Sequence, residues 1–226
     1  VAFDRPGLGF SDRAPVRGWS PATQARVLRA AAAALGVERP VVVGHSWGGA
    51  AAMAWAVQAP GATRGVLSLA GATHPWGGGV GFFYRLAASQ TFSPIASGLA
   101  RLLVDPDAPD AVLNRIFRPN APPPGYAAHI GVELALRPDA FRHNAEDLNN
   151  LDGELAAQAP LYDGLRTPVE AIHGDQDRTV WASVHSEPLA RAVADGRLTL
   201  LPGVGHMPHH VAEDETVAAI RRLASR

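Results

Sequence analysis

The sequence predicts an α/β fold in which a mostly parallel sheet has helices on both faces and a helical cap is inserted between two of its strands. Two observations lead to this prediction. Short runs of apolar, largely β-branched residues alternate with helix-like stretches, which is typical of strands buried in a parallel sheet. Residues 72–163 hold no such run, contain several Pro-separated helical stretches and are too long for a simple connection. We therefore expect a sheet domain built from residues 1–71 and 164–226 and a cap built from residues 72–163.

The strands and helices of this fold are expected in a simple order. Strands are predicted at residues 40–43, 66–70, 169–172 and 198–201, and residues 1–3 resemble the end of a further strand. Helices of the sheet domain are predicted at 21–35, where Ser20 and Pro21 supply the N-cap and first position, at 47–58, at 182–194 and from 213 onward. In the cap, helices are predicted to begin at Ser93-Pro94, to run over 107–117, and to fill two stretches between Pro124 and Leu151.

Composition excludes several classes of function. The chain has 226 residues, 47% of them hydrophobic, which is enough for a sizeable core, and its net charge of −1 leaves no basic stripe for nucleic acid. It has no cysteine, which excludes disulfides, thiolate metal sites and a cysteine nucleophile. No apolar run approaches the roughly 20 residues of a membrane helix. We expect a cytoplasmic globular enzyme that acts on a small molecule, and the sequence leaves its oligomeric state open.

Ser46 is the candidate nucleophile. It lies in Gly44-His45-Ser46-Trp47-Gly48, between a predicted buried strand and a predicted helix. A sharp turn at such a place presents the serine hydroxyl above the sheet, and glycines two residues to each side let the strand and helix approach closely. The same turn directs the Trp47 backbone N–H toward the space where an oxyanion would form.

A serine hydroxyl needs a base, and His206 is the best candidate among the nine histidines. It lies directly after the last predicted strand, so its loop opens at the same carboxyl edge of the sheet as the Ser46 turn. His45 is interpreted as a packing residue because its side chain should point away from that of Ser46. The other histidines are interpreted as the start of the final helix, or as cap or surface residues: His209 and His210, then His74, His129, His143 and His185.

The base needs a carboxylate that holds its tautomer. Asp175 and Asp177 both follow the strand predicted at 169–172, again at the carboxyl edge, and the residues alone do not separate them. With either one, the chain order is serine, aspartate, histidine.

Together these motifs resemble those of the α/β-hydrolase superfamily over nearly the whole chain. Asp4-Arg5-Pro6-Gly7-Leu8-Gly9 is similar to the loop after that family's fourth strand, and the Ser46 turn to its nucleophile elbow. The acid loop of the family has the pattern Gly-x-x-Asp, and this resemblance assigns the acid to Asp177. Gly205-His206-Met207-Pro208 resembles the histidine loop, and residues 72–163 match the position of the family's lid.

The chain departs from the family at one point. Family members carry a His-Gly loop after the third strand that supplies a second oxyanion donor, whereas the only His-Gly pair here, His173-Gly174, belongs to the acid loop. The chain starts with Val1 rather than Met. The resemblance therefore implies that the N-terminal strands of the fold, the first three, are missing from this sequence. Activity is expected of the longer parent protein.

The resemblance implies a serine hydrolase that acts on a carboxylic ester through an acyl-enzyme, with no metal and no cofactor. Alternatives are an amidase, a carbon–carbon hydrolase or a cofactor-free perhydrolase, and, outside catalysis, a ligand-binding member of the fold or an inactive fragment. Trp76, Phe82 and Phe83 are expected to line a substrate pocket or to form the cap's own core. Trp181 is expected to face the pocket or to pack beneath its own loop.

Overall fold

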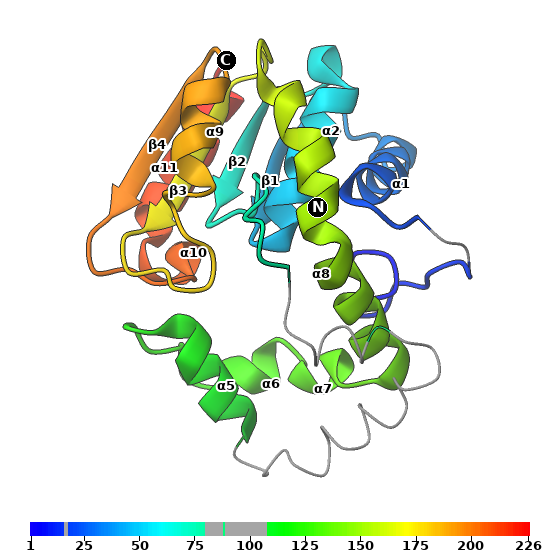
Figure 1. Cartoon of the computed structure of the whole chain (residues 1–226), viewed down its shortest axis with the longest axis vertical. Helices are drawn as coiled ribbons and strands as arrows, with labels where there is room; N and C mark the ends of the chain where they lie inside the picture. Colours follow the sequence, from blue (N-terminus) through cyan, green and yellow to red (C-terminus); the bar gives the residue numbers. More distant parts are fainter. Residues whose placement is uncertain (16–17, 80–87, 89–107) are drawn as a thin grey trace.

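The computed structural model describes residues 1–15, 18–79, 88 and 108–226. Its centre is a parallel sheet with the strand order β1-β2-β3-β4 (Figure 1). The strands are β1 (Val41–His45), β2 (Gly65–Leu69), β3 (Val169–Gly174) and β4 (Gly196–Leu201). The predicted α/β class and the four predicted strands are confirmed.

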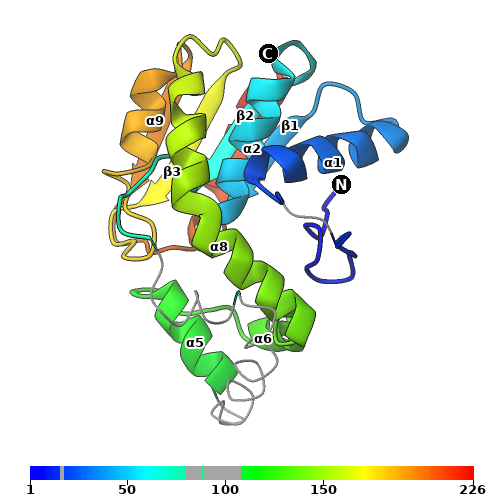
Figure 2. The ribbon, with the colours of Figure 1, turned by 45° about the vertical axis from the view of Figure 1, so that its right-hand side comes forward.

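Alternate residues of the strands bury side chains on opposite faces of the sheet. On one face, Val66 and Val169 pack against helices α2 (Trp47–Gln58) and α9 (Ser186–Ala192). On the other face, Leu67 and Ile172 pack against helix α11 (Glu213–Ala224). Figures 1 and 2 show α2 and α9 in front of the sheet and α11 behind it. This double cover explains why apolar residues occur on both faces of β2 and β3, since all residues of the two strands are buried.

Helix α1 (Pro21–Ala34) forms where its cap residues predict it. The Ser20 hydroxyl accepts a hydrogen bond from the Thr23 N–H at 3.1 Å, with Pro21 in the first turn. Its alanine-rich face packs against α2 at Trp55. A short 3₁₀ turn, η1 (Pro60–Ala62), then leads from α2 to β2.

The segment between β2 and β3 is helical in its described part. Its elements are α5 (Ala108–Phe117), α6 (Tyr126–His129), α7 (Val132–Ala135), α8 (Pro138–Gln158) and the 3₁₀ turn η2 (Ala159–Tyr162). Helices α5 to α7 lie beyond the carboxyl ends of the strands, and α8 runs back along α2 (Figure 1). The helix predicted to begin at Ser93 lies outside the described residues.

Helix α8 is longer than predicted, because it ends at Gln158 rather than near Leu151. One face of its last two turns packs against α2. Leu155 lies in an apolar cluster with residues of α2, and the Gln158 side chain donates a hydrogen bond to the Ala50 carbonyl at 3.0 Å. Helix α9 is shorter than predicted, because residues 182–185 form turns before it and it ends at Ala192.

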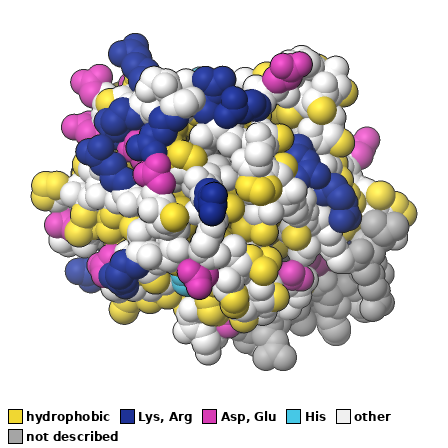
Figure 3. All heavy atoms as spheres, turned by 90° about the horizontal axis from the view of Figure 1, so that it is seen from above, with side chains coloured by type: hydrophobic (Ala, Val, Ile, Leu, Met, Phe, Trp, Pro, Cys, Tyr) yellow, Lys and Arg dark blue, Asp and Glu magenta, His cyan; other side chains and the backbone are white. Residues whose placement is uncertain are grey.

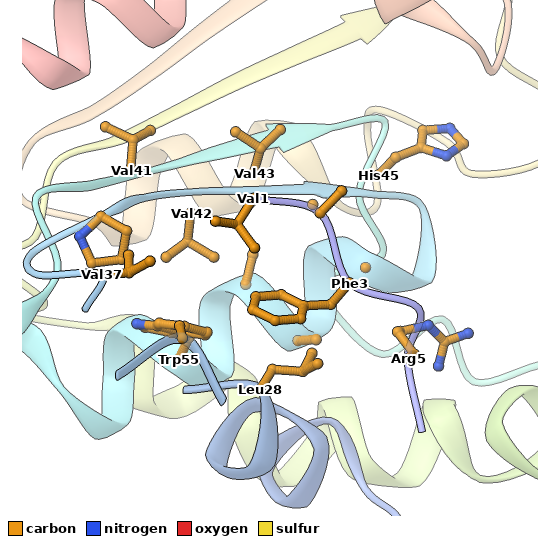
Figure 4. Close-up of a pocket in the computed structure, with 17 residues that line it drawn as sticks. Val1, Phe3, Arg5, Leu28, Val37, Val41, Val42, Val43, His45 and Trp55 are labelled. Atoms are coloured by element: carbon orange, nitrogen blue, oxygen red, sulfur yellow. The ribbon is translucent and has the colours of Figure 1, made fainter. Parts of the chain in front are cut away.

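The strand expected at residues 1–3 is absent from the structure, and this prediction was wrong. In the described part of the chain β1 pairs only with β2, so the segment has no strand beside it. Val1 and Phe3 instead line an apolar groove of about 450 Å³ along the free edge of β1, together with Val42 and Trp55 (Figure 4). For the same reason Val43, in the middle of β1, is 44% exposed.

The amino ends of the strands lie opposite α5 to α7. Seen from this side, the surface shows arginine and acidic side chains interspersed with apolar ones (Figure 3). Of the helices in the described ranges, none combines the length and apolar character that crossing a membrane requires.

Candidate functional site

Ser46 lies in a strained turn between β1 and α2. Its backbone has φ 52° and ψ −120°, a left-handed conformation that a residue with a side chain adopts only when its surroundings hold it there. Here the Ser46 N–H donates to the Leu69 carbonyl at 3.0 Å, and the Ser46 carbonyl accepts from the N–H groups of Gly49 and Ala72 at 2.9 Å each. These bonds to β2 and its following loop fix the turn at the carboxyl edge of the sheet.

The glycine before this turn is required by packing. A side chain at Gly44 would collide with the Gly48 carbonyl, so β1 and α2 could not approach as closely as they do. Trp47 is the first residue of α2, and the N–H groups of a helix's first turn have no acceptor within the helix. The turn therefore joins a hydroxyl and the positive end of a helix dipole.

His206 and Asp177 form a buried hydrogen-bonded pair. The Nδ1–H of His206 donates to Oδ2 of Asp177 at 2.7 Å, and the two side chains are 5% and 0% exposed. Oδ1 of Asp177 accepts from the backbone N–H groups of Thr179 and Val180 at 2.8 and 3.0 Å. Asp175, the other candidate acid, instead accepts from the Gly203 N–H at 2.8 Å.

Asp177 is a carboxylate at neutral pH. Burial alone would raise its pKa, but hydrogen bonds from His173 and His206 outweigh burial and hold the pKa well below its usual value. A buried carboxylate on Nδ1 leaves Nε2 of His206 as the nitrogen that can accept a proton.

His173 is a part of this site that the sequence analysis missed. It is fully buried, and its Nε2 lies 2.7 Å from the Val180 carbonyl and 3.1 Å from Oδ2 of Asp177. A carbonyl only accepts, so Nε2 carries the proton and Nδ1 accepts from the Ser186 hydroxyl at 2.5 Å. Oδ2 of Asp177 thus faces two imidazole N–H groups. The available signal was the position of His173 at the end of β3, immediately before the acid loop.

His45 does more than pack. Its Nε2 donates to the His206 carbonyl at 2.8 Å, and its ring centre lies 4.8 Å from that of His206 and 4.7 Å from that of His209. Burial, with the neighbouring histidines, lowers the pKa of His45 to about 3, so it is neutral. His209 belongs to the short helix α10 (Pro208–Val211). These contacts hold the loop that carries His206.

Ser46 and Trp47 line an apolar cavity of about 520 Å³. Two of the aromatic residues expected at a pocket, Trp76 and Trp181, lie in its wall, and Trp181 is 61% exposed. The described apolar side chains that complete the wall are Ala72, Leu148, Leu151, Val180 and Val184. Phe82 and Phe83 lie outside the described residues.

His185 also lines this cavity, and its interpretation as a cap or surface residue was wrong. It is 5% exposed, and its Nδ1 accepts hydrogen bonds from the N–H groups of Thr73 and His74 at 3.3 and 3.2 Å. His143 lies within residues 72–163, the predicted cap, and is 9% exposed on α8.

The Trp47 ring is held between the N-terminal loop and α8. The Arg5 guanidinium lies 3.8 Å from the ring centre, and the indole N–H donates to the Asp147 carbonyl at 3.2 Å. The Asp147 carboxylate, 1% exposed, pairs with Arg5 at 2.5 Å and with Arg13 at 2.7 Å. This network fixes one wall of the cavity.

Across the described ranges, no three His, Cys, Asp or Glu side chains are grouped so that they could hold a metal ion. The chemistry available at the site is that of a hydroxyl, an imidazole, a carboxylate and the N–H groups of a helix terminus.

Comparisons with known proteins identify the fold family of the chain. A family model described as the alpha/beta hydrolase fold matches residues 1–213. No curated protein matches the chain. Solved structures with the same fold include a 2-hydroxy-6-oxo-6-phenylhexa-2,4-dienoate hydrolase from a Rhodococcus species, with a TM-score of 0.74 and 17% identity over 97% of this chain and 77% of that one. An esterase from Exiguobacterium antarcticum has a TM-score of 0.70 and 19% identity over 98% and 78%. An alpha/beta hydrolase fold protein from Burkholderia ambifaria has a TM-score of 0.72 and 20% identity over 96% and 77%.

Proposed function

The chain belongs to the alpha/beta hydrolase fold family, and from this premise we propose that it is a serine hydrolase that cleaves a carboxylic ester by way of an acyl-enzyme. Ser46 is the nucleophile, His206 the general base and Asp177 the acid that orients it. The observation that supports this most is the buried 2.7 Å bond between His206 and Asp177, which shares the carboxyl edge of the sheet with the strained Ser46 turn.

The reaction has two steps. In the first, the Ser46 hydroxyl oxygen attacks the ester carbonyl carbon while Nε2 of His206 takes the hydroxyl proton. The tetrahedral oxyanion accepts a hydrogen bond from the Trp47 N–H, and collapse expels the alkoxide, which takes the proton from His206. In the second step, a water molecule gives a proton to His206 and attacks the acyl carbon, and Ser46 leaves with that proton.

Asp177 supports both steps through charge. The imidazolium formed at His206 is paired with a carboxylate that is buried and already ionised. His173 donates to the same carboxylate oxygen, so it positions Asp177 without touching the reacting atoms.

The cavity beside Ser46 supports an ester with an apolar acyl group of small or medium size. Its wall is formed largely by tryptophan and aliphatic side chains, which bind hydrocarbon and offer few polar partners. Residues 72–163 are proposed to act as a cap, since Trp76 and Leu151 of this segment lie in that wall.

This proposal is tested with 4-nitrophenyl butyrate. We expect a burst of nitrophenol followed by slower turnover, and loss of both in Ser46→Ala and His206→Ala. Ser225→Ala, which removes an exposed hydroxyl at the C-terminal end, is the matched control and should keep full activity. Equal rates in Ser46→Ala and the native chain, or no hydrolysis of any ester in a panel of acyl lengths, would refute the proposal. Parallel amide substrates then decide between esterase and amidase.

A further inference from the structure

A second pocket, of about 730 Å³, lies beside His206 and has a different character from the apolar cavity. Its described lining includes three arginines, Arg115, Arg118 and Arg178, and no aspartate or glutamate. The two pockets have Thr179 in common, so they meet next to the His206–Asp177 pair. One side of the proposed reaction centre is therefore apolar and the other is cationic.

The three arginine side chains have no protein counter-ion within the ranges that the structure describes. By contrast, Arg5 and Arg13 pair with Asp147, and Arg222 pairs with Glu170. Three guanidinium groups gathered without a carboxylate repel one another, and an anion among them relieves this repulsion. Guanidinium groups also bind carboxylates and phosphates with two parallel hydrogen bonds.

The backbone that carries Arg115 and Arg118 is clamped to the His206 loop. The Asn120 side chain accepts from the Gly205 N–H at 3.0 Å and donates to the Gly203 carbonyl at 3.2 Å. Gly205 packs so closely on the Arg118 carbonyl that a side chain there would collide with it. The backbone of these two residues is thereby held beside the His206 loop.

The same segment is anchored a second time by aromatic contacts. Phe117 and Tyr126 pack edge to face at 5.1 Å, and the Tyr126 hydroxyl lies 3.0 Å from Nε2 of His210 in α10. Arg178 is held from the other side, because it directly follows Asp177, whose Oδ1 accepts from the next two N–H groups. The backbone that carries the three exposed arginine side chains is thus held at the His206 side of the site.

The reaction decides which part of the substrate meets the arginines. In the proposed function, on which this inference rests, His206 protonates the leaving alcohol, so the alcohol part of the ester must lie on the His206 side. The acyl part then occupies the apolar cavity beside Ser46 and Trp47. We infer that the substrate is an ester whose alcohol part carries an anionic oxygen group, such as a carboxylate, bound by Arg115, Arg118 and Arg178.

The test compares two esters that differ in one charge: 4-carboxyphenyl butyrate and its neutral isostere 4-carbamoylphenyl butyrate. We expect kcat/KM to favour the carboxylate ester by about tenfold or more, as charge-assisted hydrogen bonds to one carboxylate would give. Added salt should reduce this preference. The triple variant Arg115→Gln, Arg118→Gln and Arg178→Gln should lose it while still hydrolysing the neutral ester.

Arg197→Gln is the matched control, because Arg197 is an exposed arginine at the amino end of β4, away from the site. It should keep the preference. An unchanged preference in the triple variant, with the neutral ester still hydrolysed, overturns the inference and leaves the proposed function standing. If the native chain hydrolyses neither ester, the proposed function is overturned instead.

Binding of the product alcohol, 4-hydroxybenzoate, tests the pocket without catalysis. By titration calorimetry we expect saturable binding that the triple variant loses and Arg197→Gln retains. Absence of saturable binding to the native chain, or equal binding to the triple variant, overturns the inference whatever the esters show.

Discussion

Replacing Asp177 with asparagine should nearly abolish activity while leaving the chain folded. Four N–H groups point at this side chain: those of His206 and His173 at Oδ2, and those of Thr179 and Val180 at Oδ1. An asparagine has one oxygen and one NH₂ group, so in either orientation its NH₂ faces two donors.

The orientation that keeps both backbone bonds places the NH₂ opposite His206. The imidazole must then carry its proton on Nε2 instead of Nδ1, and a protonated Nε2 can no longer accept the proton of Ser46. The equivalent change in a serine protease lowers kcat about 10⁴-fold, a barrier increase of about 5 kcal/mol, and we expect a similar loss here. The second N–H of the asparagine then faces the Nε2–H of His173 without an acceptor, and one unsatisfied buried donor should cost about 1–3 kcal/mol of unfolding free energy.

The assay is kcat on 4-nitrophenyl butyrate, with circular dichroism to verify folding. Asp175→Asn is the matched control, since Asp175 is exposed and accepts only from the Gly203 N–H. Its kcat should stay within about threefold of native, because one exposed hydrogen bond is affected. The reasoning fails if folded Asp177→Asn keeps kcat within about tenfold of the native value, or if both variants lose activity equally.

Two further predictions concern stability. Asp147→Asn leaves Arg5 and Arg13 without their buried counter-charge and should lower unfolding free energy by about 3 kcal/mol, or Tm by roughly 6–12 °C; an unchanged Tm would contradict this. Burial, with neighbouring histidines, lowers the pKa of His185 to about 4. Between about pH 6.5 and pH 4 this histidine is therefore protonated in the unfolded chain but neutral in the folded chain. The free energy of unfolding should then rise with pH across this range, by up to about 1.4 kcal/mol per pH unit. In urea unfolding at pH 7, 6 and 5, His185→Gln should flatten this slope and exposed His129→Gln should not; equal slopes in all three chains would refute the assignment.

Local sequence patterns predicted the fold because each strand and most helix ends carry their own signal. The valines of β1 indicate a strand wherever it lies, and Ser20-Pro21 starts α1 without help from the rest of the chain. Such local patterns do not indicate how many neighbouring strands each strand has in the sheet. The run at 41–43 predicted a buried strand, yet β1 lies at an edge of the described sheet and most of its residues are only partly buried.

The order of serine, aspartate and histidine, each directly after a strand, predicted which residues gather at the carboxyl edge. The partners that depend on distant contacts could not be predicted in this way. Arg115 and Arg118 reach the His206 loop because Asn120 bonds to a loop more than 80 residues away. His173 was visible at the end of a strand, but its bond to Asp177 depends on how the acid loop folds back toward β3.

The most direct test of the central claim is intact-mass analysis after incubation with a fluorophosphonate, which reacts with activated serines. We predict one adduct on the native chain and none on Ser46→Ala, with adduct formation much slower in Asp177→Asn. An adduct that persists in Ser46→Ala, or a folded native chain that forms none, would contradict the claim that Ser46 is the nucleophile of a serine hydrolase.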